Sequence, residues 1–463
     1  MHIRQALTTC GALLTAILLW MPNSAAQSAK PTLTTLYSFQ GPSAQPPDGW
    51  IPEGVVIGSG GKLYGTTEYG GAYGACVPHC GEPGFGTVFE LTPPSGPGGA
   101  WSETVLLNFS GGNDGFNPTA GVAIGKGGVL YGTTLYKEYR SSCGTVFALI
   151  PPTLPGGAWT QNVLHRFART GGEGCGPYTG VVVGDNGVVY GTTVSGGSSD
   201  DGTVFALSPP ASPGGSWSMR TLHNFTGAPG DGYAPNGLLI GRDGGLYGTT
   251  QGGGTGPCTD PFSGCGTVFS LAPPASPGGA WTEEVLYNFM GAFGDGALPL
   301  GSPVMGSGPG GRPALYGATT YGGNGPCAVL TNGCGTVFSL TGPASPGGAW
   351  TEAVLYNFNG PPGDGAYPAS GLVIGNGPST EAVLYGTTLH GSSNAGTVFS
   401  LTPPSSPGGA WTETVLYALP DSSAGPDGTL VIGSGPGGHP LLYGTTQGGG
   451  TPDGLGTVFS LQP

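Results

Sequence analysis

Short apolar runs with strand-like periodicity recur along the whole chain, and none has the spacing of an amphipathic helix. Residues 371–375 (GLVIG) form an apolar run between glycines, which fits a strand buried on both faces. Residues 383–388 (VLYGTT) and 396–401 (GTVFSL) are rich in β-branched and aromatic side chains, and residues 410–417 (AWTETVLY) alternate with period two. The Pro-Gly linker at 403–409 cannot continue a strand and predicts a turn. Each copy therefore predicts four strands, which we call A to D in chain order.

Three sequence motifs occur seven times each and define a repeat. The motif GTVF begins at Gly86, Gly144, Gly202, Gly266, Gly335, Gly396 and Gly456. The motif YGTT, or YGAT in one copy, begins at Tyr64, Tyr131, Tyr190, Tyr247, Tyr316, Tyr385 and Tyr443. A run of the VLYNF type ends at Phe39, Phe109, Phe167, Phe225, Phe289, Phe358 and Leu419. Copies spaced by roughly 60 residues indicate a repeat architecture.

Four strands per repeat, joined by tight turns, predict an all-β fold: a seven-bladed β-propeller of four-stranded blades with strand A lining the central channel. The chain begins with a D-type run at residues 34–39 that no A, B or C strand precedes, and it ends with a C strand at 456–461 that no D strand follows. We therefore expect the N-terminal strand to join the last blade and close the ring. Residues 31–463 would form this single domain. An open β-solenoid is the structural alternative, although its repeats are usually shorter.

Composition fits a repeated, turn-rich fold. The chain of 463 residues contains 97 Gly and 46 Pro. Without a period, such a content would indicate disorder, but here both residues recur with the repeat and mark the turns between strands. The 11 Lys and Arg residues do not cluster, and the net charge is −14. Such a chain offers no surface that neutralises phosphates, so we expect no nucleic-acid partner.

The N-terminal 26 residues predict a secretory signal peptide. His2 and Arg4 precede an apolar run at residues 6–20, and Ser24, Ala25 and Ala26 provide small residues for cleavage. The run is shorter than the ~20 residues that a membrane span needs, so we expect no transmembrane segment in the mature chain. The expected location is extracellular or periplasmic.

Eight cysteines remain after removal of the signal peptide, and an even number in an exported chain favours disulfides. Their places in the loops between YGTT and GTVF predict the local pairs Cys76–Cys80, Cys258–Cys265 and Cys327–Cys334, which leaves Cys143 for Cys175. The alternative is a metal site at Cys76, His79 and Cys80, but a structural zinc site needs four ligands and no fourth lies nearby in sequence.

The repeated motifs resemble the GloVer tandem repeats of bacterial "choice-of-anchor" secreted proteins. The resemblance lies in LYGTT at residues 63–67 with GTVF at 86–89, and in the six later copies, so it covers essentially the whole mature chain. It implies export and association with the cell surface, without a known activity and without catalytic residues to carry over. The chain departs from that family in having no recognisable C-terminal sorting tail.

In a four-stranded blade, the D-to-A and B-to-C loops lie on one face, and this face varies between repeats, as binding surfaces usually do. Its D-to-A loops carry the acids Asp48, Asp114, Glu173, Asp231, Asp295, Asp364 and Asp427. Aromatic residues accompany several of them, and a carboxylate beside a ring suits a sugar. The predicted ligand-binding residues are Trp50, Asp114, Phe116, Asp231, Tyr233, Asp364 and Tyr367. The structural alternatives are Asx-turns for the acids and packing between blades for the rings.

No catalytic motif stands out: GxSxG, HExxH and GxxxxGKS are all missing from the sequence. We therefore expect a monomeric, non-enzymatic binding module without cofactor or metal, with extracellular glycan as the favoured ligand and a cell-surface protein as another possible partner. Two alternatives stay open. One is a hydrolase or lyase acting on polysaccharide, although no carboxylate pair can be chosen from the sequence. The other is a purely structural surface module.

Overall fold

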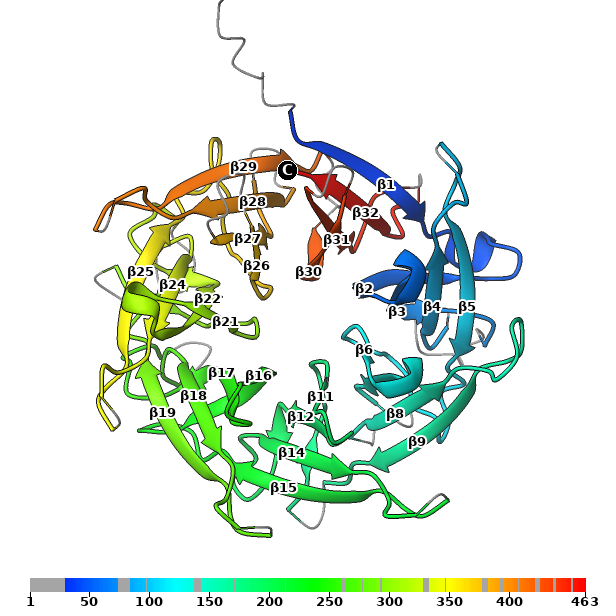
Figure 1. Ribbon diagram of the computed structural model, residues 1–463, viewed down its shortest axis with the longest axis horizontal. Coiled ribbons are helices and arrows are strands. Elements are labelled where there is room, and N and C mark those ends of the chain that lie inside the picture. The colour runs from blue at the N-terminus through cyan, green and yellow to red at the C-terminus, as the bar shows by residue number, and fades with distance from the viewer. Residues whose placement is uncertain are drawn as a thin grey trace, which may run out of the picture. The chain divides into compact units, whose positions relative to one another are not determined.

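Seven four-stranded antiparallel sheets stand side by side in a ring within the part of the chain that the structure describes (Figure 1). The computed structural model describes residues 30–463 apart from residues 74–83, 97, 137–142, 170–171, 213, 260–262, 277, 292–293, 328–332, 346, 377–381, 392–394, 407, 421–424, 436–438 and 451–452. Pro31–Pro463 form one compact unit. The predicted signal peptide lies outside the described residues.

Each blade uses four strands in order from the centre of the ring outward (Figure 1). Blade 1 contains β2 (Gly49–Ile57), β3 (Leu63–Gly70), β4 (Thr87–Thr92) and β5 (Ser102–Asn108). Blade 2 contains β6 (Ala123–Ile124), β7 (Leu130–Thr134), β8 (Thr145–Ile150) and β9 (Thr160–Arg166). Blade 3 contains β11 (Val182–Val183), β12 (Val189–Thr193), β14 (Thr203–Ser208) and β15 (Ser218–Asn224). Blade 4 contains β16 (Gly232–Ile240), β17 (Leu246–Gly253), β18 (Thr267–Ala272) and β19 (Thr282–Asn288).

The remaining blades follow the same order. Blade 5 contains β21 (Val304–Ser307), β22 (Pro313–Thr319), β24 (Thr336–Thr341) and β25 (Thr351–Asn357). Blade 6 contains β26 (Val373–Asn376), β27 (Ala382–Thr388), β28 (Thr397–Thr402) and β29 (Thr412–Ala418). Blade 7 contains β30 (Pro426–Ser434), β31 (Pro440–Thr446), β32 (Thr457–Gln462) and, outermost, β1 (Thr32–Ser38). Strand D thus begins just after its Trp, so that Trp411 lies in the linker rather than in the strand.

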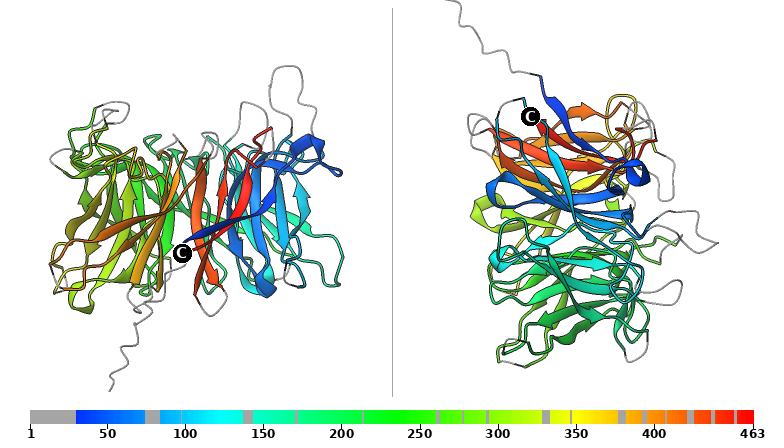
Figure 2. Two further views of the ribbon diagram at one scale, coloured as in Figure 1. Left: turned by 90° about the horizontal axis from the view of Figure 1, so that it is seen from above. Right: turned by 90° about the vertical axis from the view of Figure 1, so that its right-hand side faces the viewer.

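The predicted closure by the N-terminal strand is confirmed. Strand β1 pairs antiparallel with β32, with Thr32 opposite Gln462 and Leu33 opposite Leu461 (Figures 1 and 2). The first and last strands therefore belong to the same sheet, and the ring closes without a covalent link between them. An open solenoid is excluded by this pairing.

The motifs YGTT and GTVF belong together because they pair across strands B and C. The second Thr of YGTT shares a buried hydroxyl–hydroxyl hydrogen bond with the Thr of GTVF in all seven blades, at 2.7–2.9 Å, as between Thr67 and Thr87. Gly65 of YGTT lies opposite Phe89 of GTVF, and a Cβ at Gly65 would stand 2.6 Å from the Phe89 ring. Only glycine leaves room for that ring, which fixes both motifs at once.

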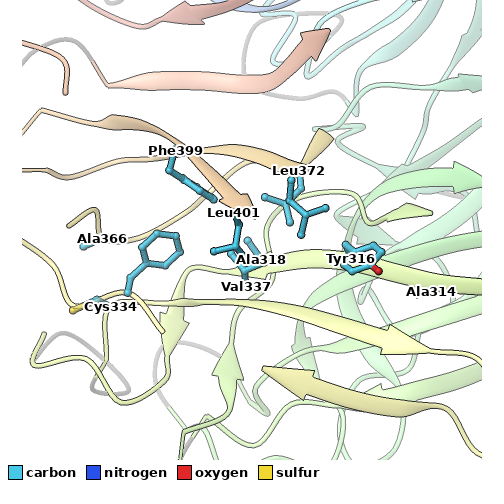
Figure 3. Packing of buried hydrophobic residues seen from close by; sticks show 11 residues of the cluster. Ala314, Tyr316, Ala318, Cys334, Val337, Ala366, Leu372, Phe399 and Leu401 are labelled. Atoms are coloured by element: carbon cyan, nitrogen blue, oxygen red, sulfur yellow. The ribbon is translucent and has the colours of Figure 1, made fainter. Parts of the chain in front are cut away.

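Neighbouring blades pack through two kinds of aromatic contact that recur around the ring. The Phe at the end of strand D meets the Phe of GTVF in the next blade with the ring centroids 5.0–5.3 Å apart, as between Phe39 and Phe89. Farther along, the Tyr of YGTT meets the Trp of the next blade, as between Tyr316 and Trp411. Figure 3 shows one such cluster, in which Tyr316 and Val337 of blade 5 lie together with Leu372, Phe399 and Leu401 of blade 6. The core is thus a series of seven interblade layers.

Short pairings hold the D-to-A and B-to-C loops together on one face. Strand β10 (Gly174–Cys175) pairs with β13 (Ser195–Gly196), and β20 (Gly296–Ala297) pairs with β23 (Tyr321–Gly322). Three short 3-10 turns connect strand A to strand B on the other face: η2 (Ser59–Gly61), η3 (Lys126–Gly128) and η4 (Pro309–Gly311). A fourth, η1 (Gly41–Ser43), belongs to a D-to-A loop and so to the first face. These turns are the helices of the described residues, and none of them has the length to cross a bilayer.

Three of the four predicted disulfides are present. Cys258–Cys265 and Cys327–Cys334 each lie within one B-to-C loop, and Cys143–Cys175 joins a loop of blade 2 to a loop of blade 3. The fourth predicted pair, Cys76–Cys80, lies outside the described residues, as does His79.

Removing strand β1 should strongly destabilise the ring, because β32 would lose its partner strand and Phe39, now fully buried, would no longer fill the layer against Phe89. Loss of one buried Phe alone typically removes ~3–5 kcal/mol, so we expect the melting temperature to fall by on the order of 10 °C or more. Thermal unfolding of a chain that starts at Gly41 is compared with one that starts at Pro31. Equal melting temperatures would contradict closure by β1.

Candidate functional site

The acids of the D-to-A loops fold back onto their own loops. Five of them accept a hydrogen bond at 2.7–3.2 Å from the backbone N–H of the residue that follows the Phe of the VLYNF-type run: Asp48, Asp114, Asp231, Asp295 and Asp364. Asp231, Asp295 and Asp364 also accept from the N–H of their own following glycine at 2.6 Å. The turn-forming interpretation of these acids is therefore the one that the hydrogen bonds support.

A second set of contacts ties the same acids to strand D. The hydroxyls of Tyr37, Tyr287 and Tyr356 donate to Asp48, Asp295 and Asp364 at 2.7–3.1 Å, and the imidazoles of His165 and His223 lie 3.2 and 3.4 Å from Glu173 and Asp231. Both histidines stand at the position in strand D that Tyr287 occupies in blade 4.

The predicted aromatic ligand contacts are packed among other loop side chains. Trp50 lies against Tyr69, and Tyr367 lies against Tyr321 and His390. Phe116 is 8% exposed and packs on Phe85 and Tyr136. Together with Asp114, Asp231, Tyr233 and Asp364, these residues come from blades 1, 2, 4 and 6, so the structure distributes them around the ring. A ligand at these residues stays a prediction.

A different set of residues converges at the centre of the ring. In every repeat, the residue after a proline at the start of strand A lies where the channel opens on the loop face. The seven residues are Glu53, Thr119, Tyr178, Asn236, Leu300, Ala369 and Asp427. Six of them, all except Asn236, line a cavity of about 460 Å³ together with the strands A below them. We call this the channel mouth.

Asp427 therefore does not belong to the ring of loop acids where the sequence motif had placed it. It follows Pro426, which packs on Gly396 as Pro52 packs on Gly456, so Asp427 is the counterpart of Glu53 rather than of Asp48. The loop into blade 7 is shorter than its siblings, and the Asp-Gly dipeptide in it is a coincidence of sequence. This shift brings a second carboxyl group into the channel mouth.

Glu53 and Asp427 come from neighbouring blades and lie within hydrogen-bonding reach of each other. Asp427 is fixed by two donors: the Gly428 N–H bonds Oδ1 at 2.7 Å, and the Gln447 side-chain amide bonds Oδ2 at 2.7 Å. Glu53 is only 9% exposed. A buried carboxyl group beside a fixed carboxylate is more stable with its proton, because two adjacent charges repel.

The electrostatics agree with a protonated Glu53. Burial raises the pKa of Glu53 well above its usual value, and the negative charges of Asp427 and Glu68 add to the rise. Burial, together with Glu53, Asp427 and Glu68, also raises the pKa of the Tyr178 phenol. Tyr178 is 48% exposed, and it responds to charges on blades 7 and 1 although it belongs to blade 3. The Tyr178 ring therefore lines the channel mouth and is about half exposed to solvent.

The channel mouth has a polar arc and an apolar arc. Amides accompany the acids: Asn117 donates to Glu68 at 3.4 Å, and Gln251 donates to the buried Asn236 at 3.2 Å. Blades 5 and 6 contribute Leu300 and Ala369 instead. The channel mouth is therefore not sevenfold symmetric. Its polar arc offers a ligand hydrogen-bond donors, hydrogen-bond acceptors and one aromatic face on the same side.

The sequence held a signal for this site that motif searching missed. The position after the proline is among the most variable in a repeat whose neighbouring positions hardly change, and so is the position after YGTT, which supplies Glu68, Gln251 and Gln447. The position after the proline lines the channel mouth, and residues at the position after YGTT act on its acids: Gln447 donates to Asp427, and the charge of Glu68 raises the pKa of Glu53.

Four blade junctions also contain a half-buried glutamate. Glu103, Glu283, Glu352 and Glu413 occupy the same place in strand D, and each leaves its Oε1 buried without a hydrogen-bond partner. Burial first, and then the loop acid of the same junction, raises the pKa of each from its usual value of 4.5 to about 7. We call the strand D Tyr or His, the loop acid and this glutamate a junction cluster.

The fold and the channel mouth define a repeat-built β-propeller with one polar, aromatic-bearing arc at its centre. The chain belongs to the Gloeobacter/Verrucomicrobia repeat family, whose model matches residues 73–256 and 153–379 and so covers more than half of the sequence. This confirms the resemblance drawn from YGTT and GTVF. No curated protein matches the chain.

Solved structures that are similar to this chain are distant. PorZ, an essential bacterial surface component of the type-IX secretion system of Porphyromonas gingivalis, has 13% identity and a TM-score of 0.49, covering 92% of this chain and 48% of PorZ. The GH93 α-L-arabinofuranosidase of Fusarium graminearum has 12% identity and a TM-score of 0.41, covering 93% and 97%. The NanB sialidase of Streptococcus pneumoniae has 12% identity and a TM-score of 0.42, covering 92% and 70%. This chain spans about half the length of the PorZ chain, and such distant likenesses support no conclusion about ligand or activity.

The junction glutamates predict stability that falls as pH rises. In the folded chain they keep their protons up to about pH 7, whereas in the unfolded chain they lose them near pH 4.5. Their contribution is therefore complete below about pH 4.5 and is lost as pH rises through about 7. Glu53, whose pKa is also raised, acts in the same direction.

The melting temperature of the wild type, measured in the presence of a chelator, should therefore fall as the pH rises from about 5 to 8. Replacing all four junction glutamates by Gln should flatten the decline, while Glu284→Gln, at an exposed neighbour of Glu283, should leave it intact. A decline of the same size in the fourfold variant would show that other groups cause it.

Proposed function

We propose that this protein is an exported, non-enzymatic binding module that takes an extracellular glycan at its channel mouth. The observation that carries the proposal is the meeting of Tyr178, Glu53 and Asp427 at one arc of the channel. The 1–26 signal peptide predicted from the sequence supports export. Three disulfides support it further, because such bonds persist in oxidising compartments.

A sugar suits this arc for two physical reasons. Sugar hydroxyls both donate and accept hydrogen bonds, and the arc offers both kinds of partner: a protonated Glu53, the Asp427 carboxylate and the exposed Gln447 amide. The apolar face of a pyranose ring stacks on an aromatic side chain, and Tyr178 presents one that is accessible. The net charge of −14 disfavours polyanionic ligands, so a neutral glycan fits better than an acidic one.

The spacing of the carboxyl groups favours binding over hydrolysis. Glycosidases hold their two carboxyl groups about 5–5.5 Å or 6.5–9.5 Å apart, so that the scissile bond or a water molecule fits between them. Glu53 and Asp427 lie within hydrogen-bonding reach of each other, which leaves no such space between them. Binding therefore needs no rearrangement of the pair, whereas catalysis by the pair does.

A glycan array tests the proposal, with the affinity for any glycan found measured on variants. Tyr178→Ala should weaken binding by roughly 10–30-fold, since it removes the stacking face. The matched control is Tyr73→Ala, which removes an equally exposed tyrosine from a B-to-C loop of the same face and should leave affinity unchanged. Equal losses in the two variants, or no loss in Tyr178→Ala, would place the ligand elsewhere.

The alternative is a polysaccharide hydrolase, and a proton-holding Glu53 beside Asp427 and Glu68 is the feature that favours it. One substitution separates the two functions. Glu53→Gln keeps the shape and the hydrogen bonds of a protonated carboxyl group but has no proton to transfer, so glycan binding should change less than about threefold while hydrolysis would fall by about 100-fold or more. Reducing-sugar release from polysaccharides is the measurement. Release by the wild type that Glu53→Gln abolishes would overturn the binding proposal in favour of the hydrolase.

A further inference from the structure

The junction between blades 3 and 4 differs from its siblings in a way that the channel mouth does not explain. Its cluster consists of His223 from β15, Asp231 from the loop into blade 4, and Glu283 from β19. One ligand atom from each lies within 4.8 Å of the other two, and among the described residues this is the group of three possible metal ligands that come so close together. We propose that these three side chains bind one divalent transition-metal ion, for which zinc is the test ion.

The donor set is suited to such an ion. Zinc takes imidazole nitrogen and carboxylate oxygen at about 2.0–2.2 Å, often from three protein groups with water as the fourth ligand. Ligand atoms around such an ion lie roughly 3.3–3.5 Å apart. His223 Nε2 and Asp231 Oδ2 are already 3.4 Å apart, and a Glu283 carboxylate oxygen belongs to the same group, whose ligand atoms lie within 4.8 Å of one another.

Two further contacts favour the site. Asp231 is held by the N–H and hydroxyl of Thr226 at 2.9 and 3.0 Å and by the Gly232 N–H at 2.6 Å, which orient it as outer contacts orient metal ligands. Glu283 Oε1 is buried and has no hydrogen-bond partner, so it is free to bind an ion. The His223 and Asp231 side chains remain 21% and 16% exposed, which leaves a way in from solvent.

The sibling junctions show what a cluster without a metal looks like. Tyr37, Tyr287 and Tyr356 stand in the place of His223 and donate their hydroxyls to the loop acid. A protonated phenol is no ligand for zinc. At the junction between blades 2 and 3 the imidazole is present as His165, but Met219 stands in the place of Glu283. Only the junction between blades 3 and 4 combines all three donors among the described residues.

Substitutions borrowed from the siblings give matched controls. His223→Tyr converts this cluster into one that already exists at three other junctions, so the ring is expected to fold while losing the nitrogen ligand. Glu283→Gln removes the third ligand but keeps its shape, and it decides the question if His223→Tyr folds poorly. His165→Tyr makes the same exchange at the junction that lacks the glutamate, and it should not affect metal binding.

The experiment is zinc titration by calorimetry on the chelator-treated full-length mature protein, with thermal melts in zinc and in chelator. We expect one zinc per chain, at least a 100-fold loss of affinity in His223→Tyr and in Glu283→Gln, and wild-type affinity in His165→Tyr. Zinc at ~100 times its dissociation constant should raise the melting temperature by roughly 3–5 °C in the wild type and in His165→Tyr. The proposal is overturned if the wild type takes up no zinc. It is equally overturned if folded His223→Tyr or Glu283→Gln binds zinc as the wild type does, since the ion would then lie elsewhere, for example near Cys76, His79 and Cys80.

Discussion

The constraint on which the whole structure depends is that no blade has a core of its own. A four-stranded sheet has two faces, and the large buried rings of this protein lie between sheets, where the Phe that ends one strand D meets the Phe of the next GTVF. Each blade is therefore stable only between two neighbours, and a row of blades would leave two faces bare. Joining the first strand to the last blade removes both bare faces at once, and this explains why the repeats form a closed ring.

The fold could be predicted because each motif residue meets the same neighbour in every copy. Gly65 accommodates Phe89, Thr67 bonds Thr87, and these local pairings reappear blade after blade, so sevenfold repetition in sequence becomes sevenfold repetition in space. Two of the described disulfides were predictable for the same reason, since they occupy equivalent loops, whereas Cys143–Cys175 followed by elimination. Strand ends were less certain: Trp411 packs on Tyr316 outside the strand that its alternating pattern had included.

The channel mouth could not be predicted because it depends on what differs between repeats. Asp427 looked like the loop acids, since it precedes a glycine, and only its place after Pro426 shows that it faces Glu53. The proximity of Tyr178 to that pair joins three blades and has no trace in any single repeat. The same holds for His223 and Glu283, which lie far apart in sequence and meet only across a junction.

The pairing of β1 with β32 has a mechanical consequence. Because the strands are antiparallel and Thr32 lies opposite Gln462, the outer ends of both strands leave the sheet on the same side. Tension applied between those two ends would load the interstrand hydrogen bonds one after another, as in opening a zipper, rather than all together in shear. Each bond contributes only ~0.5–1.5 kcal/mol, so blade 7 is the point at which the ring yields first under force. Blades 2 and 3, which Cys143–Cys175 joins covalently, would stay together after it opens.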